Sequence, residues 1–275
     1  MNKKILLVLI ILMGLLIQSM AQGDLLITPK RVVFEGNKQR EELNLVNIGK
    51  DTTTYSISFI QKIMKEDGSF VNIENPVPGQ MFADTYLRIF PRTVTLAPGE
   101  PQVIMLQCRR NPDMLPGEYR SHLFFRSEKD YNPLGTKNSD QDSMKLSVQL
   151  IPIYGMSIPV IIRSGAVQVN NTLVDLKLEN RQDSIQFLNL TITRTGNIST
   201  YGDIKIQFIP SDGKPFEIDG KRGVGIYTNI NKRNVTIKIN SKQSKILKNG
   251  KLKVQYISNE EGKKPVVYAE GVLDI

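Results

Sequence analysis

The sequence predicts an all-β fold of two immunoglobulin-like β-sandwich domains behind a secretory signal peptide. Short alternating apolar runs separated by turn residues fill residues 24–273, a pattern typical of sandwiches. No stretch has the apolar spacing of a long amphipathic helix. The strand pattern restarts after Pro159, which predicts a second domain. The expected divisions are a signal peptide at 1–21, a first domain at 22–157 and a second domain at 158–275.

The first residues have the features of an export signal. Lys3 and Lys4 precede an apolar run at residues 5–17, and a small-x-small pattern ends at Ala21, before Gln22. This arrangement predicts cleavage after Ala21 and folding outside the cytoplasm. The run is shorter than the roughly 20 apolar residues that a spanning helix needs, although an uncleaved anchor is the alternative.

About seven strands are expected in the first domain, the number that an immunoglobulin-like sandwich needs. Pro29 in the first run predicts an edge strand, because proline cannot donate to a central ladder. Asp67-Gly68 predicts a hairpin turn. Tyr119 follows Pro116-Gly117 at a strand start, where a tyrosine corner would place it. The expected strands are residues 25–36, 43–46, 52–63, 86–96, 102–109, 118–127 and 144–151.

The strand at residues 144–151 has the clearest alternation in the chain. Its apolar positions are Met144, Leu146, Val148 and Leu150. A period of two indicates one dry face and one wet face. Two interpretations remain open from the pattern alone. The strand is an ordinary sandwich strand, or it lends its apolar row to a partner protein.

A proline-marked crossing follows this strand. Pro152, Gly155 and Pro159 are expected to form a hinge that joins the two halves; the alternative is that the prolines simply end a strand. The second half has weaker alternation but the same class of pattern. Its expected strands are residues 172–180, 184–194, 203–210, 223–229, 234–240, 252–258 and 266–275, with turns at Asp212-Gly213 and Asp219-Gly220 among others.

Composition limits the possible partners. The single cysteine, Cys108, excludes an intrachain disulfide and is interpreted as a packed small side chain. The formal net charge is +9, of which Lys3 and Lys4 in the signal peptide supply two. The charges are scattered and tryptophan is absent, so nucleic acid is not the expected partner. A basic cleft for an anionic protein terminus fits better.

Residues for catalysis are lacking in the sequence. The sole histidine, His122, lies inside a strand and is interpreted as structural. No His/Cys cluster has the spacing of a metal site, so no metal and no cofactor are expected. Neither a phosphate-binding glycine loop nor a GxSxG turn occurs. The chain is therefore not expected to be an enzyme.

Four stretches together resemble the periplasmic pilus-assembly chaperones of the chaperone–usher pathway, and the PGEYRSHL form looks most like the archaic branch. The stretches are RVVFEG from Arg31, RIFPRTVTLAPGEPQVIML from Arg88, LPGEYRSHLFF from Leu115 and MKLSVQLIPIYGMSIPV from Met144. The resemblance covers most of residues 24–165. It implies two immunoglobulin-like domains set at an angle, with a cleft between them.

The resemblance also implies roles for individual residues. Met144, Leu146, Val148 and Leu150 match the donor strand that completes an unfinished pilin sandwich. Arg31 matches the cleft arginine that grips the subunit's terminal carboxylate, a ligand suited to a planar guanidinium. The sequence departs from the best-known branch at Tyr154, where a second, lysine ligand is expected. A second cation is supplied by Arg88, Arg92 or Arg163, or it is absent.

The expected function is therefore a periplasmic, non-enzymatic chaperone. Its expected partners are fimbrial or pilin subunits and an outer-membrane usher, and no nucleic acid. The alternative is a secreted immunoglobulin-like structural or adhesion module, which would remain in the assembled surface structure.

Overall fold

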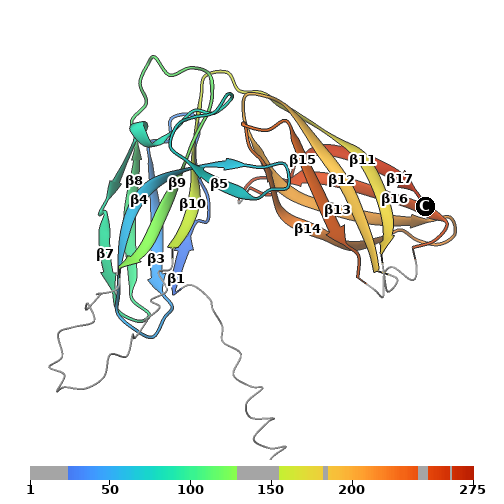
Figure 1. Ribbon diagram of the computed structural model, residues 1–275, viewed down its shortest axis with the longest axis horizontal. Helices are drawn as coiled ribbons and strands as arrows, with labels where there is room; N and C mark the ends of the chain where they lie inside the picture. Colours follow the sequence, from blue (N-terminus) through green and yellow to red (C-terminus); the bar gives the residue numbers. More distant parts are fainter. Residues whose placement is uncertain (1–23, 129–154, 182–184, 241–246, 261) are drawn as a thin grey trace, which may run out of the picture.

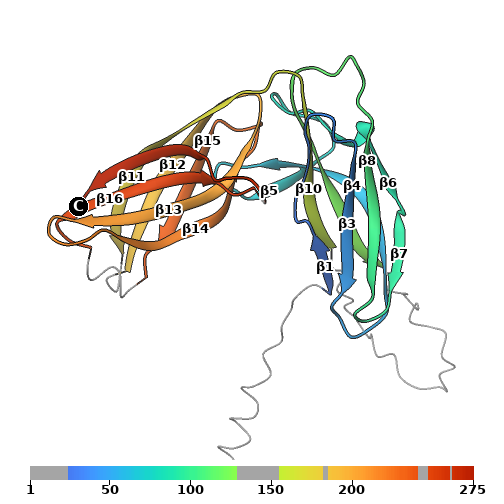
Figure 2. The ribbon, with the colours of Figure 1, turned by 180° about the vertical axis from the view of Figure 1, so that it is seen from behind.

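The computed structural model describes residues 24–128, 155–181, 185–240, 247–260 and 262–275. They form two β-sandwiches set at an angle to each other (Figures 1 and 2), which confirms the predicted fold class. The predicted signal peptide, the row from Met144 to Leu150, Pro152 and Tyr154 lie outside the described residues. Within the described part, the helical element is a short 3₁₀ turn, η1 (Asp84–Tyr86). No helix in that part is long and apolar enough to cross a membrane.

Two sheets build the first sandwich. The first sheet has the strand order β1-β3-β8-β6 and the second has the order β2-β10-β9-β4-β5, with β7 also paired to β4. The first sheet consists of β1 (Leu25–Thr28), β3 (Arg40–Asn47), β8 (Pro101–Cys108) and β6 (Leu87–Phe90). The second consists of β2 (Val32–Phe34), β10 (Gly155–Ser164), β9 (Gly117–Glu128), β4 (Thr53–Met64), β5 (Phe70–Ile73) and β7 (Thr93–Leu96).

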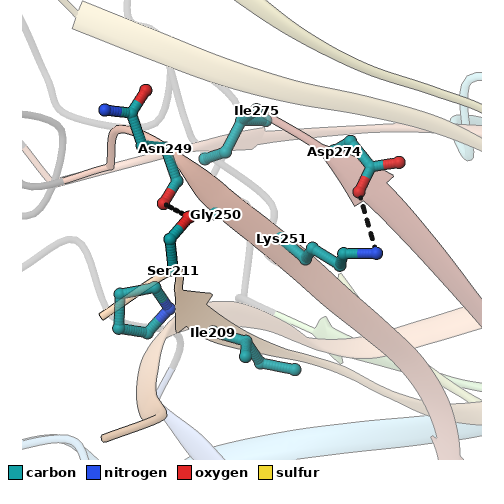
Figure 3. A pocket seen from close by; sticks show the side chains of 8 residues that line it. Ile209, Ser211, Asn249, Gly250, Lys251, Asp274 and Ile275 are labelled. Carbon is teal, nitrogen blue, oxygen red and sulfur yellow. Dashed lines mark hydrogen bonds and ion pairs between the residues drawn. The ribbon is translucent and has the colours of Figure 1, made fainter. Parts of the chain in front are cut away.

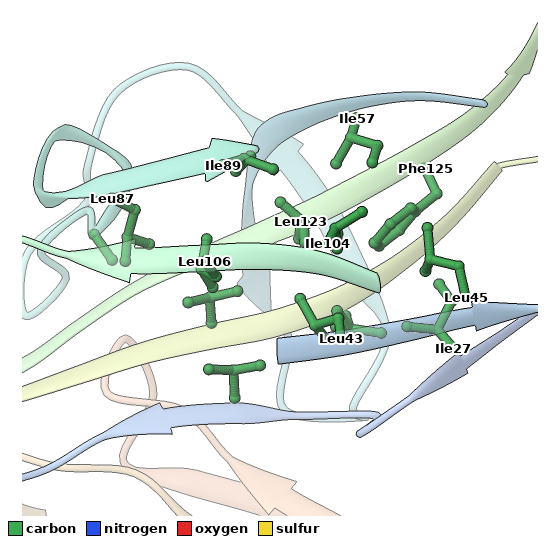
Figure 4. Packing of buried hydrophobic residues seen from close by; sticks show 14 of the residues in the cluster. Ile27, Leu43, Leu45, Ile57, Leu87, Ile89, Ile104, Leu106, Leu123 and Phe125 are labelled. Atoms are coloured by element: carbon green, nitrogen blue, oxygen red, sulfur yellow. The ribbon is translucent and has the colours of Figure 1, made fainter. Parts of the chain in front are cut away.

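The core of the first sandwich follows from alternation along the strands. In β8, Ile104 and Leu106 are fully buried, whereas Val103 and Met105, which alternate with them, are exposed. Leu43 of β3 packs with them from the neighbouring strand (Figure 4). Leu123 and Phe125 of β9 close the core from the opposite sheet (Figure 4). Cys108 is buried in the same cluster, as expected from the sequence.

The chain changes sheet where prolines interrupt it. Residues 25–36 were expected to form one strand, but β1 lies in the first sheet and β2 in the second, with Pro29 between them. Pro91 separates β6 from β7 in the same way. A proline lacks the N–H that continues a ladder, so a strand breaks there and its two parts pair with different neighbours. Both parts of the first run lie at sheet edges, in agreement with the prediction for Pro29.

The predicted tyrosine corner is present. The hydroxyl of Tyr119 accepts a hydrogen bond of 2.8 Å from the backbone N–H of Leu115. This contact ties the loop before β9 to the first residues of that strand. The predicted hairpin at Asp67-Gly68 also forms, between β4 and β5.

The structure corrects the predicted domain boundary and hinge. β10 runs antiparallel to β9 along its full length, and Ile158, Val160 and Ile162 pack in the first core. The division expected between residues 157 and 158 therefore falls inside a strand of the first sandwich. Gly155 and Pro159 lie in this strand rather than in a hinge. The sandwiches are joined by residues 165–168, between β10 and β11.

One flank of β10 is partly open. β2 pairs with β10 in parallel through Val160–Ile162 and no further. Residues 155–159 pair with β9 on one side, and on the other side no strand of the described ranges pairs with them. This flank therefore presents backbone groups that another strand could pair with.

The second sandwich packs a three-stranded sheet on a four-stranded sheet. The first has the order β11-β12-β15 and the second β14-β13-β16-β17. Tyr256, Phe208 and Leu252 are among its fully buried core residues. Its strands are β11 (Val169–Arg181), β12 (Ile185–Gly196), β15 (Lys232–Lys238), β14 (Phe216–Ile226), β13 (Thr200–Pro210), β16 (Gly250–Ser258) and β17 (Val267–Asp274).

Candidate functional site

The outer face of the second sheet of the first sandwich lies against the second sandwich. Along β9, Tyr119 and Leu123 face the first core, so Glu118, Arg120 and His122 face the other way. Every residue of β9 from Gly117 to Leu123 is nevertheless buried. The second sandwich supplies the cover for this outward row.

A buried ion pair links the two sandwiches. Arg120 donates to Glu118 Oε1 from Nε at 3.1 Å and from Nη2 at 2.6 Å. Arg120 Nη2 also donates to the hydroxyl of Ser199, just before β13. Ser199 in turn donates to Glu118 Oε2 from its backbone N–H at 3.0 Å and from its hydroxyl at 2.7 Å. Glu118 thus holds β9 and the second sandwich together.

The electrostatics of this pair depend on its hydrogen bonds. Burial alone would raise the pKa of Glu118, but Arg120 and the bonds from Ser199 outweigh it and hold that pKa below its usual value. The guanidinium of Arg120 also lies 3.6 Å from the ring centroid of Tyr227, a cation–π contact from the second sandwich. Both charges are therefore retained inside the interface.

His122 extends the same row. Its Nε2 lies 3.1 Å from the hydroxyl of Tyr227, and its Nδ1 has no hydrogen-bond partner among the described residues. Burial, with added repulsion from Arg120 and Lys62, lowers the pKa of His122 to about 3. The imidazole is neutral at physiological pH and is a structural part of the interface, as the sequence indicated.

The β4–β5 hairpin forms a second bridge. Asn229 accepts from the backbone N–H of Met64 at 3.3 Å and donates to the carbonyl of Met64 at 2.8 Å. Beyond Met64, the carbonyl of Glu66 accepts from the backbone N–H of Asn234 at 2.8 Å and from Arg233 at 3.1 Å. The hairpin tip therefore pairs with the second sandwich through main-chain groups.

Arg31 lies in this interface directly before β2. Its guanidinium carbon is 5.0 Å from the ring centroid of Tyr201 of β13. Its Nε and Nη2 are shielded from solvent and have no hydrogen-bond partner among the described residues. Burial lowers its pKa, and the charges of Arg120 and Arg163 lower it further. Arginine nonetheless keeps its charge in proteins, so two donors on a cation are left unsatisfied.

A cavity of about 80 Å³ adjoins Arg31 between the two sandwiches. It is lined from both sides, by Arg31, Met64 and Phe70 of the first sandwich and by Tyr201, Gly225 and Tyr227 of the second among others. Apart from its two arginines, its lining is largely apolar and aromatic. A group that combines a negative charge with a small apolar part would satisfy both features.

The neighbouring charges are already paired. Glu35 pairs with Arg163 and, at 3.1 Å, with Lys263, which also pairs with Glu260 at 2.6 Å. Glu118 pairs with Arg120 and lies 3.8 Å from Arg163. Within this network Arg31 is the cation to which no carboxylate is bonded. It is the group that an incoming anion would meet.

Of the three arginines considered as a second cation, Arg163 is the one placed in the cleft. It lies on β10 opposite Glu118 and contributes to the electrostatic environment of Arg31. Arg88 lies on β6 in the other sheet and donates to the adjacent carbonyl of Leu87. Arg92 lies between β6 and β7. The geometry therefore favours Arg163, already engaged by Glu35, over Arg88 and Arg92.

The chain is similar in structure to chaperones of fimbriae and pili. One is the CsuC–CsuE chaperone–tip adhesion subunit complex of archaic Csu pili from Acinetobacter baumannii, with 13% identity over 89% of this chain and 98% of that chain, at a TM-score of 0.45. Another is the class 5 fimbriae chaperone CfaA, with 16% identity, 88% and 97% coverage and a TM-score of 0.43.

A third is the Salmonella enterica SafA pilin in complex with the SafB chaperone, with 15% identity, 89% and 95% coverage and a TM-score of 0.41. No family model and no curated protein matches the chain.

A larger cavity, of about 420 Å³, lies at the end of the second sandwich away from the first (Figures 1 and 3). Its lining includes Ser211, Lys251, Asp274 and Ile275, and Lys251 is already paired with Asp274 at 3.3 Å. Among the described residues that line it, none has a buried charged group without a hydrogen-bond partner. The smaller cavity beside Arg31 is the better candidate site.

Sequence reasoning found Arg31 but missed the residues around it. Glu118 and Arg120 appeared as ordinary members of a strand, and Tyr201 and Tyr227 had no distinguishing signal. The available signal was the spacing of Glu118, Arg120 and His122 at every second position, opposite a core face. That pattern becomes informative once the second domain is known to cover it.

Proposed function

We propose that this protein is a periplasmic chaperone that stabilises fimbrial subunits by donor-strand complementation and delivers them to an outer-membrane usher. The proposal rests on one observation above all. The open flank of β10 ends beside a buried arginine, Arg31, whose Nε and Nη2 have no hydrogen-bond partner among the described residues. Strand addition needs an open edge, and capture of a chain terminus needs a charge at the end of that edge.

The register supports a direction for the guest strand. β2 runs parallel to β10, and Val32 is the partner of Val160. The residues that precede them, Arg31 and Pro159, therefore lie at the same level. A guest strand parallel to β10 along residues 155–159 would end at Arg31 with its carboxyl terminus. Its carboxylate would then receive charge-assisted hydrogen bonds from Nε and Nη2 of the guanidinium.

The apolar row of the sequence supplies the second part of the proposal. Met144, Leu146, Val148 and Leu150 precede β10 and lie outside the described residues. Inserted into the groove of an incomplete sandwich, each would contribute about 1.5–3 kcal/mol through burial. The association costs of binding reduce the net gain. The side chains would shield the guest, and the carboxylate contact would fix its register.

The test is copurification from the periplasm of the native host, with mass-spectrometric identification of the bound chain. Leu146→Glu with Val148→Glu should abolish the complex, because two charges would enter an apolar groove. Lys145→Glu is the matched control, since it puts a glutamate on the predicted polar face of the same strand, where the native residue is already charged, and it should leave capture intact.

Two outcomes would contradict the proposal. Undiminished capture by the double variant would exclude the donor strand. Recovery of the protein in sheared surface fibres rather than in the periplasmic fraction would favour the alternative, an immunoglobulin-like structural or adhesion module.

A further inference from the structure

The cavity beside Arg31 is small, and its volume restricts which carboxylates can bind there. At about 80 Å³ it has roughly half the volume of an engineered protein cavity of ~150 Å³ that admits benzene. A carboxylate with a small aliphatic group therefore fits beside Arg31, whereas one attached to an aromatic ring does not.

We propose that this cavity restricts the residue at the carboxyl end of the guest to a small side chain, and that Gly225 and Met64 set the limit. This inference rests on the proposed capture of a chain terminus at Arg31. Phe70 is half exposed and Gly223 is exposed, so the cavity opens to the surface at these residues. A chain end can therefore reach the guanidinium.

Gly225 forms part of the wall on the side of the second sandwich. A Cβ built on this residue would lie 3.6 Å from Met64 Cε and 3.6 Å from Tyr201 Cδ2, which are ordinary contact distances. The backbone of Gly225 is not in the left-handed region. Alanine is therefore compatible with the fold at this position, and its methyl group would occupy space between Met64 and Tyr201.

Met64 forms the wall on the side of the first sandwich. Its side chain is buried, and its interdomain hydrogen bonds to Asn229 are made by the backbone. Met64→Ala would therefore enlarge the cavity while leaving those bonds in place. The two substitutions change the volume in opposite directions, which separates a size limit from general damage to the interface.

The experiment measures binding of simple carboxylates to the full mature chain by NMR of the arginine Nε–H groups. The probes are acetate, propionate and benzoate, and the Arg31 signal is assigned by its loss in Arg31→Ala. In the wild-type protein, propionate should bind at least about tenfold more tightly than benzoate. One methylene too many for an apolar pocket commonly weakens binding by about tenfold or more.

The variants should shift this order in opposite ways. Gly225→Ala should weaken propionate at least about fivefold more than acetate, and Met64→Ala should bring benzoate to within about threefold of propionate. Equal binding of benzoate and propionate by the wild-type protein would overturn the size limit and leave the anion site standing. Absence of any carboxylate effect at Arg31 would overturn both this inference and the proposed anchor.

Discussion

Arg31 stands at the level of Pro159, at the point where parallel pairing between β2 and β10 begins. Both residues line the interdomain cavity. The guanidinium thus marks the end of a strand flank that no strand of the described ranges pairs with, and its position depends on backbone register. Register is strongly specified here because Val32 and Phe34 of β2 are buried in the first core.

Replacing Arg31 should reduce capture without unfolding the protein. Arg31→Ala removes two unsatisfied donors, so copurification of the guest should fall about tenfold or more, as expected for loss of a charge-assisted hydrogen bond. Arg31→Lys should restore part of the affinity, since lysine keeps the charge but not the planar pair of donors. Quantitative pull-down measures the loss. Arg88→Ala on β6 is the control, and equal losses in both arginine variants would contradict the role given to Arg31.

Neutralising Glu118 should destabilise the whole chain. Glu118→Gln leaves Arg120 buried without its countercharge, which typically costs about 3–5 kcal/mol. The free energy of unfolding in urea measures this cost. Adding Arg120→Met to the same chain should recover part of the loss, because the orphan charge is then gone. A double-mutant cycle with no coupling between the two positions would be inconsistent with the buried pair.

Stability should fall with acid because of His122. Its pKa is about 3 in the folded chain and about 6.5 in the unfolded chain. The unfolded chain therefore binds the extra proton between these values, and stability is lost as pH falls from about 6.5 towards 3. The expected loss by pH 4 is on the order of 3 kcal/mol.

The comparison that isolates this effect is His122→Gln, which cannot titrate. The pKa values of Glu118 and Glu35 are lowered in the folded chain, so protonation of these carboxyls in acid also reduces the free energy of unfolding. This loss occurs equally in both proteins. Unfolding free energies of the two proteins from pH 7 to pH 4 should therefore diverge. Parallel curves would mean that His122 does not contribute.

The hairpin bridge should govern how firmly the sandwiches hold each other. Asn229→Ala removes both hydrogen bonds to the backbone of Met64 and should cost about 1–3 kcal/mol. The distribution of distances between spin labels on the two sandwiches should broaden in this variant. Asn72→Ala, which removes an exposed contact with Lys62 on the same hairpin, should leave the distribution unchanged. Broadening in neither variant would contradict the role given to the Asn229 bonds in holding the two sandwiches together.

Sequence periodicity was sufficient to predict the strands that have one buried and one exposed face. Ile104 and Leu106 alternate with exposed neighbours, and the strand expected at residues 102–109 is present as β8. The tyrosine corner at Tyr119 and the hairpin at Asp67-Gly68 also carried local signals, because their geometry depends on neighbouring residues.

Two predictions were wrong because a glycine and a proline that were assigned to a turn and a hinge lie within strands. Asp219-Gly220 was predicted as a turn but lies within β14, where a Cβ on Gly220 would be 1.9 Å from the carbonyl oxygen of Ile204. The glycine allows a close approach of two backbones. Pro159 was predicted as part of a hinge, yet β10 has a strand partner on one side at that point, so an absent N–H is tolerated.

The candidate site was predictable in part. Arg31 was found through resemblance to a family and lines the cavity between the two sandwiches, whereas its role as a carboxylate anchor stays a prediction. The arrangement of Glu118, Arg120 and Tyr227 was not predictable, since it depends on which face of one sandwich meets the other. No local pattern encodes a contact between residues more than a hundred positions apart.

Both faces of β9 are buried from Gly117 to Leu123, so we expect the two sandwiches to unfold as one cooperative unit. Ile161 beside it is fully buried yet belongs to neither sandwich core, so a fragment cut at the connection would expose it together with Met64. The chain forms two sandwiches, but unfolding of one sandwich would expose the surface that the other buries against it. The two sandwiches should consequently denature in one calorimetric transition, and neither half is a safe unit for expression by itself.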